Sequence, residues 1–165
     1  MKLICLVAVF LTLGSCKKTE NNGGSVVVDQ YLKVSFVSSE KNDLLKELGN
    51  TNISKLRLYY LKEGKKTMYY NPNLSDPYGI QLIVPNEQTN PSPYQLQLLL
   101  NNIGTLGENV SSTTYLDWGN GKEDTIVGYF FNDADNRILT KFKFNELEGG
   151  LKEKLGLVIV RDKIN

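Results

Sequence analysis

The chain has 165 residues, of which 41% are hydrophobic, a size that fits one domain with a substantial core and leaves little room for two. Basic and acidic side chains number 19 and 18, so the chain lacks the excess of positive charge that would favour nucleic acid as a partner. The chain has no histidine, which removes the commonest general base and the commonest neutral metal ligand together.

The first 15 residues are predicted to form a secretory signal peptide. Lys2 supplies a basic start, residues 3–13 form an apolar run, and Gly14 and Ser15 are small residues of the kind that signal peptidases accept. A membrane-spanning helix needs about 20 apolar residues. Because the apolar run ends before Gly14, a signal peptide is favoured over a membrane span.

The end of this leader, Leu13-Gly14-Ser15-Cys16, resembles the lipobox of bacterial lipoproteins. The resemblance implies cleavage before Cys16, a diacylglycerol on its sulfur and an acyl chain on its new amine. Several acyl chains would hold the protein firmly at a bilayer. Since Cys5 lies inside the leader, the processed chain would keep no pair of thiols for a disulfide.

Residues 16–25 are polar and contain two glycines, so we expect a flexible tether, followed by one folded domain over residues 26–165. In lipoprotein families, a residue other than aspartate after the lipidated cysteine usually accompanies transfer to the outer membrane. Lys17 fits that expectation. The periplasmic face and the cell surface both stay open, because the tether has Glu20 as its only acidic residue.

The rest of the chain alternates short β-branched and aromatic stretches with clusters of glycine, proline, asparagine and aspartate, which is an all-β pattern. The predicted strands cover residues 26–37, 55–62, 67–70, 79–84, 94–100, 113–118, 125–131, 138–144 and 155–161. This number of strands predicts an antiparallel two-sheet β-sandwich, immunoglobulin-like or transthyretin-like.

Turn signals predict how several strands connect. Residues 63–66 and 119–122 contain the glycines and asparagine that tight hairpin turns need, and residues 133–136 are predicted to turn the chain again. Residues 113–144 should therefore form a meander. One short helix is expected within residues 40–48, where leucines recur at helical spacing and Gly49 would end it.

Several of these segments resemble uncharacterised small Bacteroidetes-type lipoproteins, in which a lipobox precedes a β-sandwich. The residues that carry the resemblance are 42–45, 53–60, 63–65, 114–118 and 124–126. The resemblance implies the fold and the anchor, and no activity, substrate or cofactor comes with it. Residues 116–121 also resemble the signature of PKD-type adhesive domains, with Asn120 where that signature has an acidic residue.

An enzyme is not expected from this sequence. Without histidine, serine–histidine and cysteine–histidine mechanisms are unavailable, which leaves carboxylate pairs of the glycosidase kind. Asp117, Glu123 and Asp124 could approach one another across a hairpin, although a role as ordinary solvated carboxylates at a strand edge explains them better.

Residues 132–136 space oxygen donors as calcium loops do, but they lack the following glycine and the distant glutamate of such loops, so a turn is favoured. We expect no metal site and no cofactor.

Aromatic residues are the strongest candidates for ligand contact. Adjacent aromatics in a strand point to opposite faces, so one of each pair can be exposed and stack on a sugar or anchor a protein. Trp118, Tyr60 and Tyr70 are the candidate ligand-binding residues, with burial of Trp118 in the core as the competing interpretation. The sequence thus predicts a lipid-anchored, non-enzymatic binding or structural accessory protein at the outer membrane. A glycan and a protein both remain open as its partner.

Overall fold

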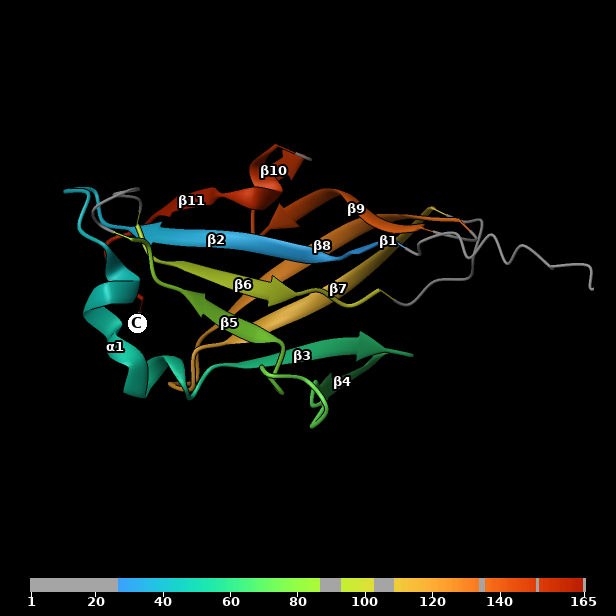
Figure 1. Ribbon diagram of the computed structural model, residues 1–165, viewed down its shortest axis with the longest axis horizontal. Coiled ribbons are helices and arrows are strands. Elements are labelled where there is room, and N and C mark those ends of the chain that lie inside the picture. The colour runs from blue at the N-terminus through green and yellow to red at the C-terminus, as the bar shows by residue number, and fades with distance from the viewer. Residues whose placement is uncertain (1–26, 87–92, 103–108, 134–135, 151, 165) are drawn as a thin grey trace, which may run out of the picture.

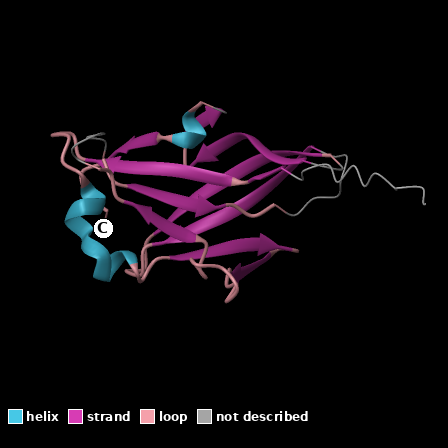
Figure 2. Ribbon diagram, viewed as in Figure 1, coloured by secondary structure: helices cyan, strands magenta, loops and turns pink. Residues whose placement is uncertain are grey.

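The computed structural model describes residues 27–86, 93–102, 109–133, 136–150 and 152–164. These residues form two β-sheets packed face to face, with sheet B lying across sheet A, and one short α-helix at one end (Figures 1 and 2). The predicted all-β sandwich with one short helix is confirmed. The predicted signal peptide, Cys16 and the predicted tether lie outside the described residues.

Sheet A has the strand order β1-β9-β8-β7-β3-β4, and β10 also pairs with β9. Its strands are β1 (Val27–Asp29), β3 (Arg57–Lys62), β4 (Lys65–Met68), β7 (Asn109–Asp117), β8 (Glu123–Asn132), β9 (Asn136–Phe144) and β10 (Leu147–Gly150). β7, β8 and β9 are successive antiparallel neighbours, which confirms the predicted meander.

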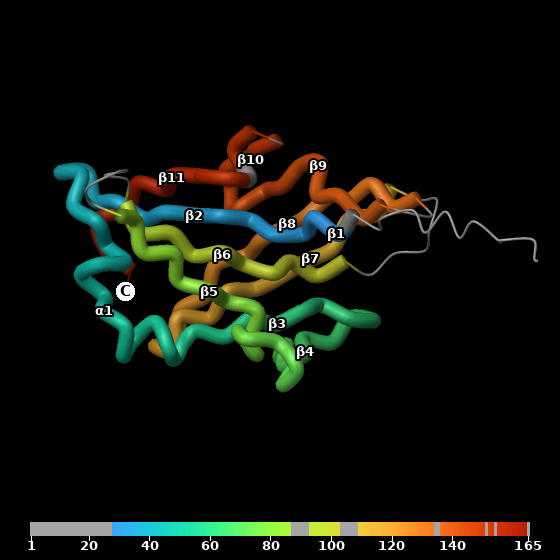
Figure 3. The backbone as a smooth tube through the Cα atoms, in the orientation of Figure 1, coloured from blue at the N-terminus to red at the C-terminus, as the bar shows by residue number. Residues whose placement is uncertain are grey.

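Sheet B has the order β11-β2-β6-β5. Its strands are β2 (Tyr31–Val37), β5 (Ile80–Ile83), β6 (Gln95–Leu99) and β11 (Leu157–Val160). β11 runs beside β2 in parallel, as β1 does beside β9, so each sheet is mixed (Figure 3). The prediction of a purely antiparallel arrangement missed these two pairs, because long-range pairing leaves no local sequence signal.

The strand predicted over residues 26–37 is two strands in different sheets. β1 ends at Asp29, β2 begins at Tyr31, and the chain crosses from sheet A to sheet B at Gln30. The Gln30 carbonyl accepts a hydrogen bond from the Leu100 backbone N–H at 3.0 Å, so its backbone is satisfied at the crossing. One extended stretch of sequence therefore links the two layers.

The core lies between the sheets and follows the alternation of side chains along each strand. Leu32, Val34 and Phe36 of β2 and Leu96 and Leu98 of β6 are fully buried. Sheet A contributes inward side chains of the same kind, namely Leu58, Leu116, Ile126, Phe130, Leu139, Phe142 and Phe144. All these residues belong to one cluster, so the described residues share a single core.

Both predicted hairpin turns are present. Glu63 and Gly64 connect β3 to β4 with positive φ angles of 49° and 73°. Between β7 and β8, Gly119 and Gly121 have φ angles of 72° and 81°. A Cβ at Gly119 would also lie 3.1 Å from the Cβ of Lys55, so both backbone conformation and space favour glycine there.

β10 and the 3₁₀ turn η1 (Glu153–Leu155) were not predicted. β10 has the sequence Leu-Glu-Gly-Gly, which has low β propensity. The first of its two glycines has a packing reason, because a Cβ at Gly149 would lie 2.2 Å from the Phe142 ring. The strand forms because Asn145, with φ of 50°, turns the chain back onto β9.

The helix α1 (Leu44–Ile53) covers one end of the sandwich (Figure 1). The Asp43 side chain caps it by accepting from the backbone N–H groups of Leu45 and Lys46. Gly49 has non-helical angles and interrupts the helix where the sequence predicts its end. A further helical turn follows to Ile53, so the element is longer than predicted. The helix buries the side chains of its own first two residues, Leu44 and Leu45.

Candidate functional site

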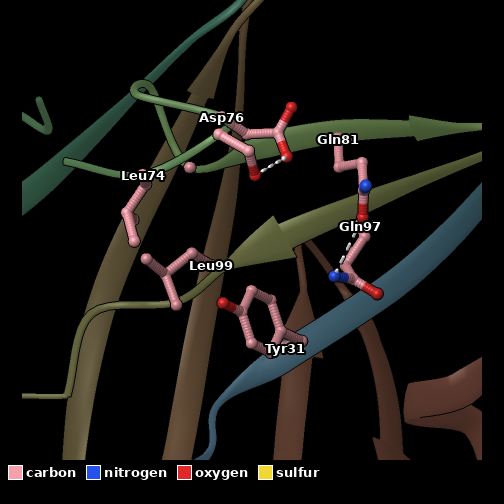
Figure 4. A pocket seen from close by; sticks show the side chains of 8 residues that line it. Tyr31, Leu74, Asp76, Gln81, Gln97 and Leu99 are labelled. Carbon is pink, nitrogen blue, oxygen red and sulfur yellow. Dashed lines mark hydrogen bonds between the residues drawn. The ribbon is translucent and has the colours of Figure 1, made fainter. Parts of the chain in front are cut away.

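A pocket of about 140 Å³ lies on the outer face of sheet B, beneath the loop that joins β4 to β5. Figure 4 shows its side chains: Tyr31 of β2, Gln81 of β5 and Gln97 and Leu99 of β6 line the sheet side, and Leu74 and Asp76 approach from the loop. We call this the loop pocket. It brings polar and apolar side chains from four segments to one place.

The alternation of the strands places these side chains. Leu32 and Leu98 point into the core, so their neighbours Tyr31 and Leu99 point to the outer face, where they are register partners. Gln81 and Gln97 are register partners in the same way on β5 and β6. The pocket floor is therefore fixed by the sheet and does not depend on loop conformation.

The loop over the pocket is held by its own hydrogen bonds. The Asn71 N–H donates to the Pro77 carbonyl at 2.8 Å, and the Gly79 N–H donates to the Asp76 carbonyl at 2.9 Å. Gly79 has a φ of 72°, and a Cβ there would lie 3.0 Å from the Tyr69 ring. Glycine at this position thus permits the loop to close against the sheet.

The pocket combines hydrogen-bonding groups with an aromatic ring. The Gln97 amide donates to the Gln81 side-chain oxygen at 3.3 Å, and the Ser75 hydroxyl donates to the Asp76 carboxylate at 3.2 Å (Figure 4). Each of these groups keeps further donor or acceptor capacity. Tyr31 is 38% exposed, so part of its ring is open to solvent. The arrangement can hydrogen-bond hydroxyl groups and pack against an apolar face.

The three aromatic residues singled out from the sequence lie in different environments. Trp118 and Tyr60 are each 6% exposed, whereas Tyr70 is 55% exposed. Burial raises the pKa of the Tyr60 phenol, and its O–H donates to the Leu99 carbonyl at 2.8 Å. Trp118 and Tyr60 are therefore largely buried, although Trp118 lines a small cavity of about 140 Å³ and Tyr60 lines a separate one of about 450 Å³. The structure does not bring the three residues together.

Tyr70 belongs to a short aromatic row at the side of the sandwich. Its ring centroid lies 5.3 Å from that of Tyr78, and the Arg57 guanidinium lies 3.8 Å from the Tyr78 ring centroid. Such a contact is a cation–π interaction. On β8, adjacent aromatic side chains point to opposite faces of the sheet, as expected: Phe130 is buried, whereas its neighbours Tyr129 and Phe131 are exposed.

Trp118 is part of a buried polar network around Asp124. The Asp124 carboxylate accepts hydrogen bonds of 2.8 Å from the Trp118 indole N–H, the Asn145 amide and the Arg161 guanidinium. The Trp118 ring also packs edge-on against Phe36, with ring centroids 5.1 Å apart. A buried carboxylate with three donors and a cation is well compensated.

The three carboxylates that could have approached one another have separate roles. Asp117 accepts from the Gly119 N–H in the hairpin turn, Glu123 pairs with Lys66, and Asp124 points inward. Asp117 and Glu123 are register partners, but each is held by a different group. Glu123 and Asp124 line one small cavity of about 140 Å³, but Asp117 does not line it and the Asp124 carboxylate is already engaged by three donors.

In the predicted turn over residues 133–136, the Asp133 side chain accepts from the Asn136 N–H at 2.6 Å, which is turn chemistry. Ala134 and Asp135 lie outside the described residues. Within the described part of the chain, no three histidine, cysteine or acidic side chains gather as metal ligands would. A search of the same residues found no helix long and apolar enough to cross a bilayer.

In comparisons with known proteins, no family model, no curated protein and no solved structure matched this chain. The class of protein is therefore defined by the fold alone, as a two-sheet β-sandwich with a polar pocket on one outer face.

The sequence did not single out Tyr31, Asp76, Gln81 or Gln97. For Tyr31, Gln81 and Gln97 the available signal was the alternation of side chains along the β2, β5 and β6 segments, which places these three residues on one outer face. Asp76 lies in the loop before β5 and has no such signal. The pairing of β2 with β6 and of β6 with β5 then brings the three strand residues together. No local pattern predicts those pairings.

We predict that Asp124→Ala lowers the free energy of unfolding by about 3 kcal/mol, because it leaves the partly buried Arg161 guanidinium without its anion. Denaturant unfolding followed by tryptophan fluorescence measures the change, since Trp118 is the only tryptophan and contacts Asp124.

Glu148→Ala is the matched control. Glu148 pairs with Lys141 at 3.0 Å, but both side chains are more than half exposed, so we expect a much smaller loss than for Asp124→Ala. Equal losses for the two variants would contradict a special role for the Asp124 network.

Proposed function

We propose that this protein is a lipid-anchored, non-enzymatic binding protein of the bacterial cell envelope, and that its ligand is a glycan held in the loop pocket. The single observation that carries the ligand class is the composition of that pocket. It joins the half-exposed Tyr31 ring to the Gln81 and Gln97 amides and the Asp76 carboxylate.

The chemistry of saccharides supports this ligand class. Amide groups can donate to and accept from neighbouring hydroxyls, a carboxylate accepts from them, and an aromatic ring packs on the C–H face of a sugar. Leu74 and Leu99 add an apolar wall. A pocket of about 140 Å³ suits one sugar unit of a longer chain and is small for a whole oligosaccharide.

Tyr31→Ala and Gln97→Ala should each weaken glycan binding about tenfold, equivalent to roughly 1.4 kcal/mol, because they remove the ring and an amide of the pocket. Retention on a glycan array, followed by isothermal titration with the best-retained glycan, measures the effect.

Tyr129→Ala is the control for that experiment, since Tyr129 is similarly exposed but lies on the outer face of sheet A. It should leave binding unchanged. An array that retains no glycan, or binding that ignores both pocket variants, would refute the proposal.

The anchor is proposed from the Leu13-Gly14-Ser15-Cys16 segment. Cys16→Ser should move the protein from the membrane pellet to the soluble fraction, because the substitution removes the sulfur that would carry the diacylglycerol. Fractionation of cells and mass spectrometry of the N-terminal peptide measure this outcome. Ser15→Ala, which keeps a small residue before the cysteine, should remain in the membrane pellet. An unmodified sulfur at residue 16 in the native protein would rule out the anchor.

A second candidate function is recognition of an extended segment of another protein, and the edge strand β11 favours it. Among the described residues, β11 pairs with β2 alone, and its Val158 and Val160 are 51% and 65% exposed. An open, apolar edge strand readily accepts an added strand. By contrast, the β4 edge of sheet A carries Lys65 and Lys66.

The hydrogen bond from the Arg161 N–H to the Val37 carbonyl fixes which backbone groups face β2. Because these groups alternate along a strand, those of Val158 and Val160 point to the open edge.

Val158→Pro should therefore remove one outward donor while leaving the ladder to β2 intact. If a protein adds a strand here, the variant should reduce photocrosslinking from position 160 in native membranes about tenfold. Val84→Lys, a change at another exposed valine, should leave the crosslink unaltered. A crosslink that survives Val158→Pro would exclude strand addition at β11.

A further inference from the structure

The end of the sandwich opposite α1 contains the larger cavity, about 450 Å³ in volume. β3 and β6 end there and β2 begins there (Figure 1). Lys62 and Arg137 line this end cavity together with Asn101, Asn102, Tyr69 and Leu100. Whereas α1 covers one end of the core, this end presents polar side chains to an open space.

The two cations occupy inward-facing positions of sheet A. On β3, Leu58 and Tyr60 point into the core, and the same alternation places Lys62 on the inner face. On β9, Arg137 is the register partner of the fully buried Asn132 of β8, so it also lies on the inner face. The inner face of sheet A thus changes from apolar to cationic at this end.

Neither cation is neutralised by an acidic side chain among the described residues. The Lys62 ammonium has one contact, with the Tyr60 ring centroid 5.9 Å away, and the Arg137 guanidinium has no ion pair there. Of the described residues that line the cavity, Glu63 alone is acidic. Elsewhere Lys66, Lys141, Lys143 and Arg161 are each paired with a carboxylate. Unpaired cations at a concave site favour an anionic ligand.

Amide groups lie between the two cations. The Asn101 amide donates to the Leu61 carbonyl at 3.3 Å, and the side chains of Asn102 and Asn132 donate to each other at 3.2 Å. β9 and β3 are separated by β8 and β7, so their backbones lie about 14 Å apart at the usual strand spacing. A ligand that spans the cavity from β3 to β9 is therefore longer than a single sugar.

The end cavity adjoins the loop pocket. Leu99 lines both, and Gln30, which lines the cavity, directly precedes Tyr31 of the pocket. A chain molecule could therefore occupy both sites at once.

We propose that the end cavity binds the acidic units of an oligosaccharide, with Lys62 and Arg137 pairing with its carboxylates. This inference rests on the proposed glycan-binding function and names the class of glycan as an acidic one. The Arg137 guanidinium suits a planar carboxylate because it can donate two parallel hydrogen bonds. Asn101 and Asn102 supply amides for hydroxyls, and Tyr69 and Leu100 supply the apolar wall.

The test compares tetragalacturonate, an oligomer of uronic acid, with the neutral maltotetraose by isothermal titration of the full chain in detergent. Wild type should bind the acidic oligomer at least tenfold more tightly than the neutral one, and added salt should reduce this preference because it screens exposed charges. Lys62→Gln with Arg137→Gln should abolish the preference.

Lys141→Gln with Lys143→Gln is the matched control, since it removes the same charge from side chains that pair with Glu148 and Glu146. It should retain the preference within about twofold in affinity, equivalent to roughly 0.4 kcal/mol. Hydrogen exchange provides a measurement that does not depend on the variants. Tetragalacturonate should slow exchange at residues 100–102 in wild type, and maltotetraose should not.

Each other outcome overturns the inference in a distinguishable way. Equal affinity for both oligomers, or a preference that survives loss of both cations, refutes the acidic class and leaves glycan binding intact. Binding of inorganic phosphate that depends on the two cations, with no saccharide bound, refutes the acidic glycan and the proposed function together. Absence of all binding by both oligomers, while the array retains a neutral glycan, refutes the inference alone.

Discussion

The Asp124 carboxylate is the interaction on which the rest of the architecture depends, because it ties the two layers together. Its three donors come from different parts of the chain: Trp118 after β7, Asn145 after β9 and Arg161 after β11. β7 and β9 belong to sheet A and β11 to sheet B. The Arg161 guanidinium also lies 4.3 Å from the Phe36 ring centroid on β2. One charged group therefore joins side chains that follow strands of both sheets.

The buried network also explains why the strongest aromatic candidate is not at the surface. Trp118 has a polar N–H that must find a partner when it is buried, and Asp124 provides it. Tyr60 is satisfied in the same way by the Leu99 carbonyl. Both residues therefore serve the packing of the sandwich in this structure. Tyr60 also lines the end cavity, and polar side chains with unused hydrogen-bonding capacity lie there and at the loop pocket.

The sequence predicts much of the fold because local rules govern it. Alternation identifies the inward side chains of β8 and β9, and Gly64, Gly119 and Gly121 identify the hairpin turns. The parallel pairs β1–β9 and β11–β2 escape prediction because each joins segments distant in sequence. The candidate site could not be predicted for the same reason, since Tyr31, Gln81 and Gln97 become neighbours only through the β2–β6 and β6–β5 pairings. Lys62 and Arg137 look like ordinary solvated charges until the sheet order places them on one inner face.

The short strand β1 has a mechanical consequence for a domain held by its N-terminus. β1 contributes three residues to the edge of sheet A, and no residue of β1 belongs to the described core, which begins at Leu32. Tension applied through the preceding segment would load the β1–β9 ladder first. Peeling β1 away would release about 10 Å of extended chain at the usual rise per residue. The domain would then gain reach under strain while its two packed layers stay folded.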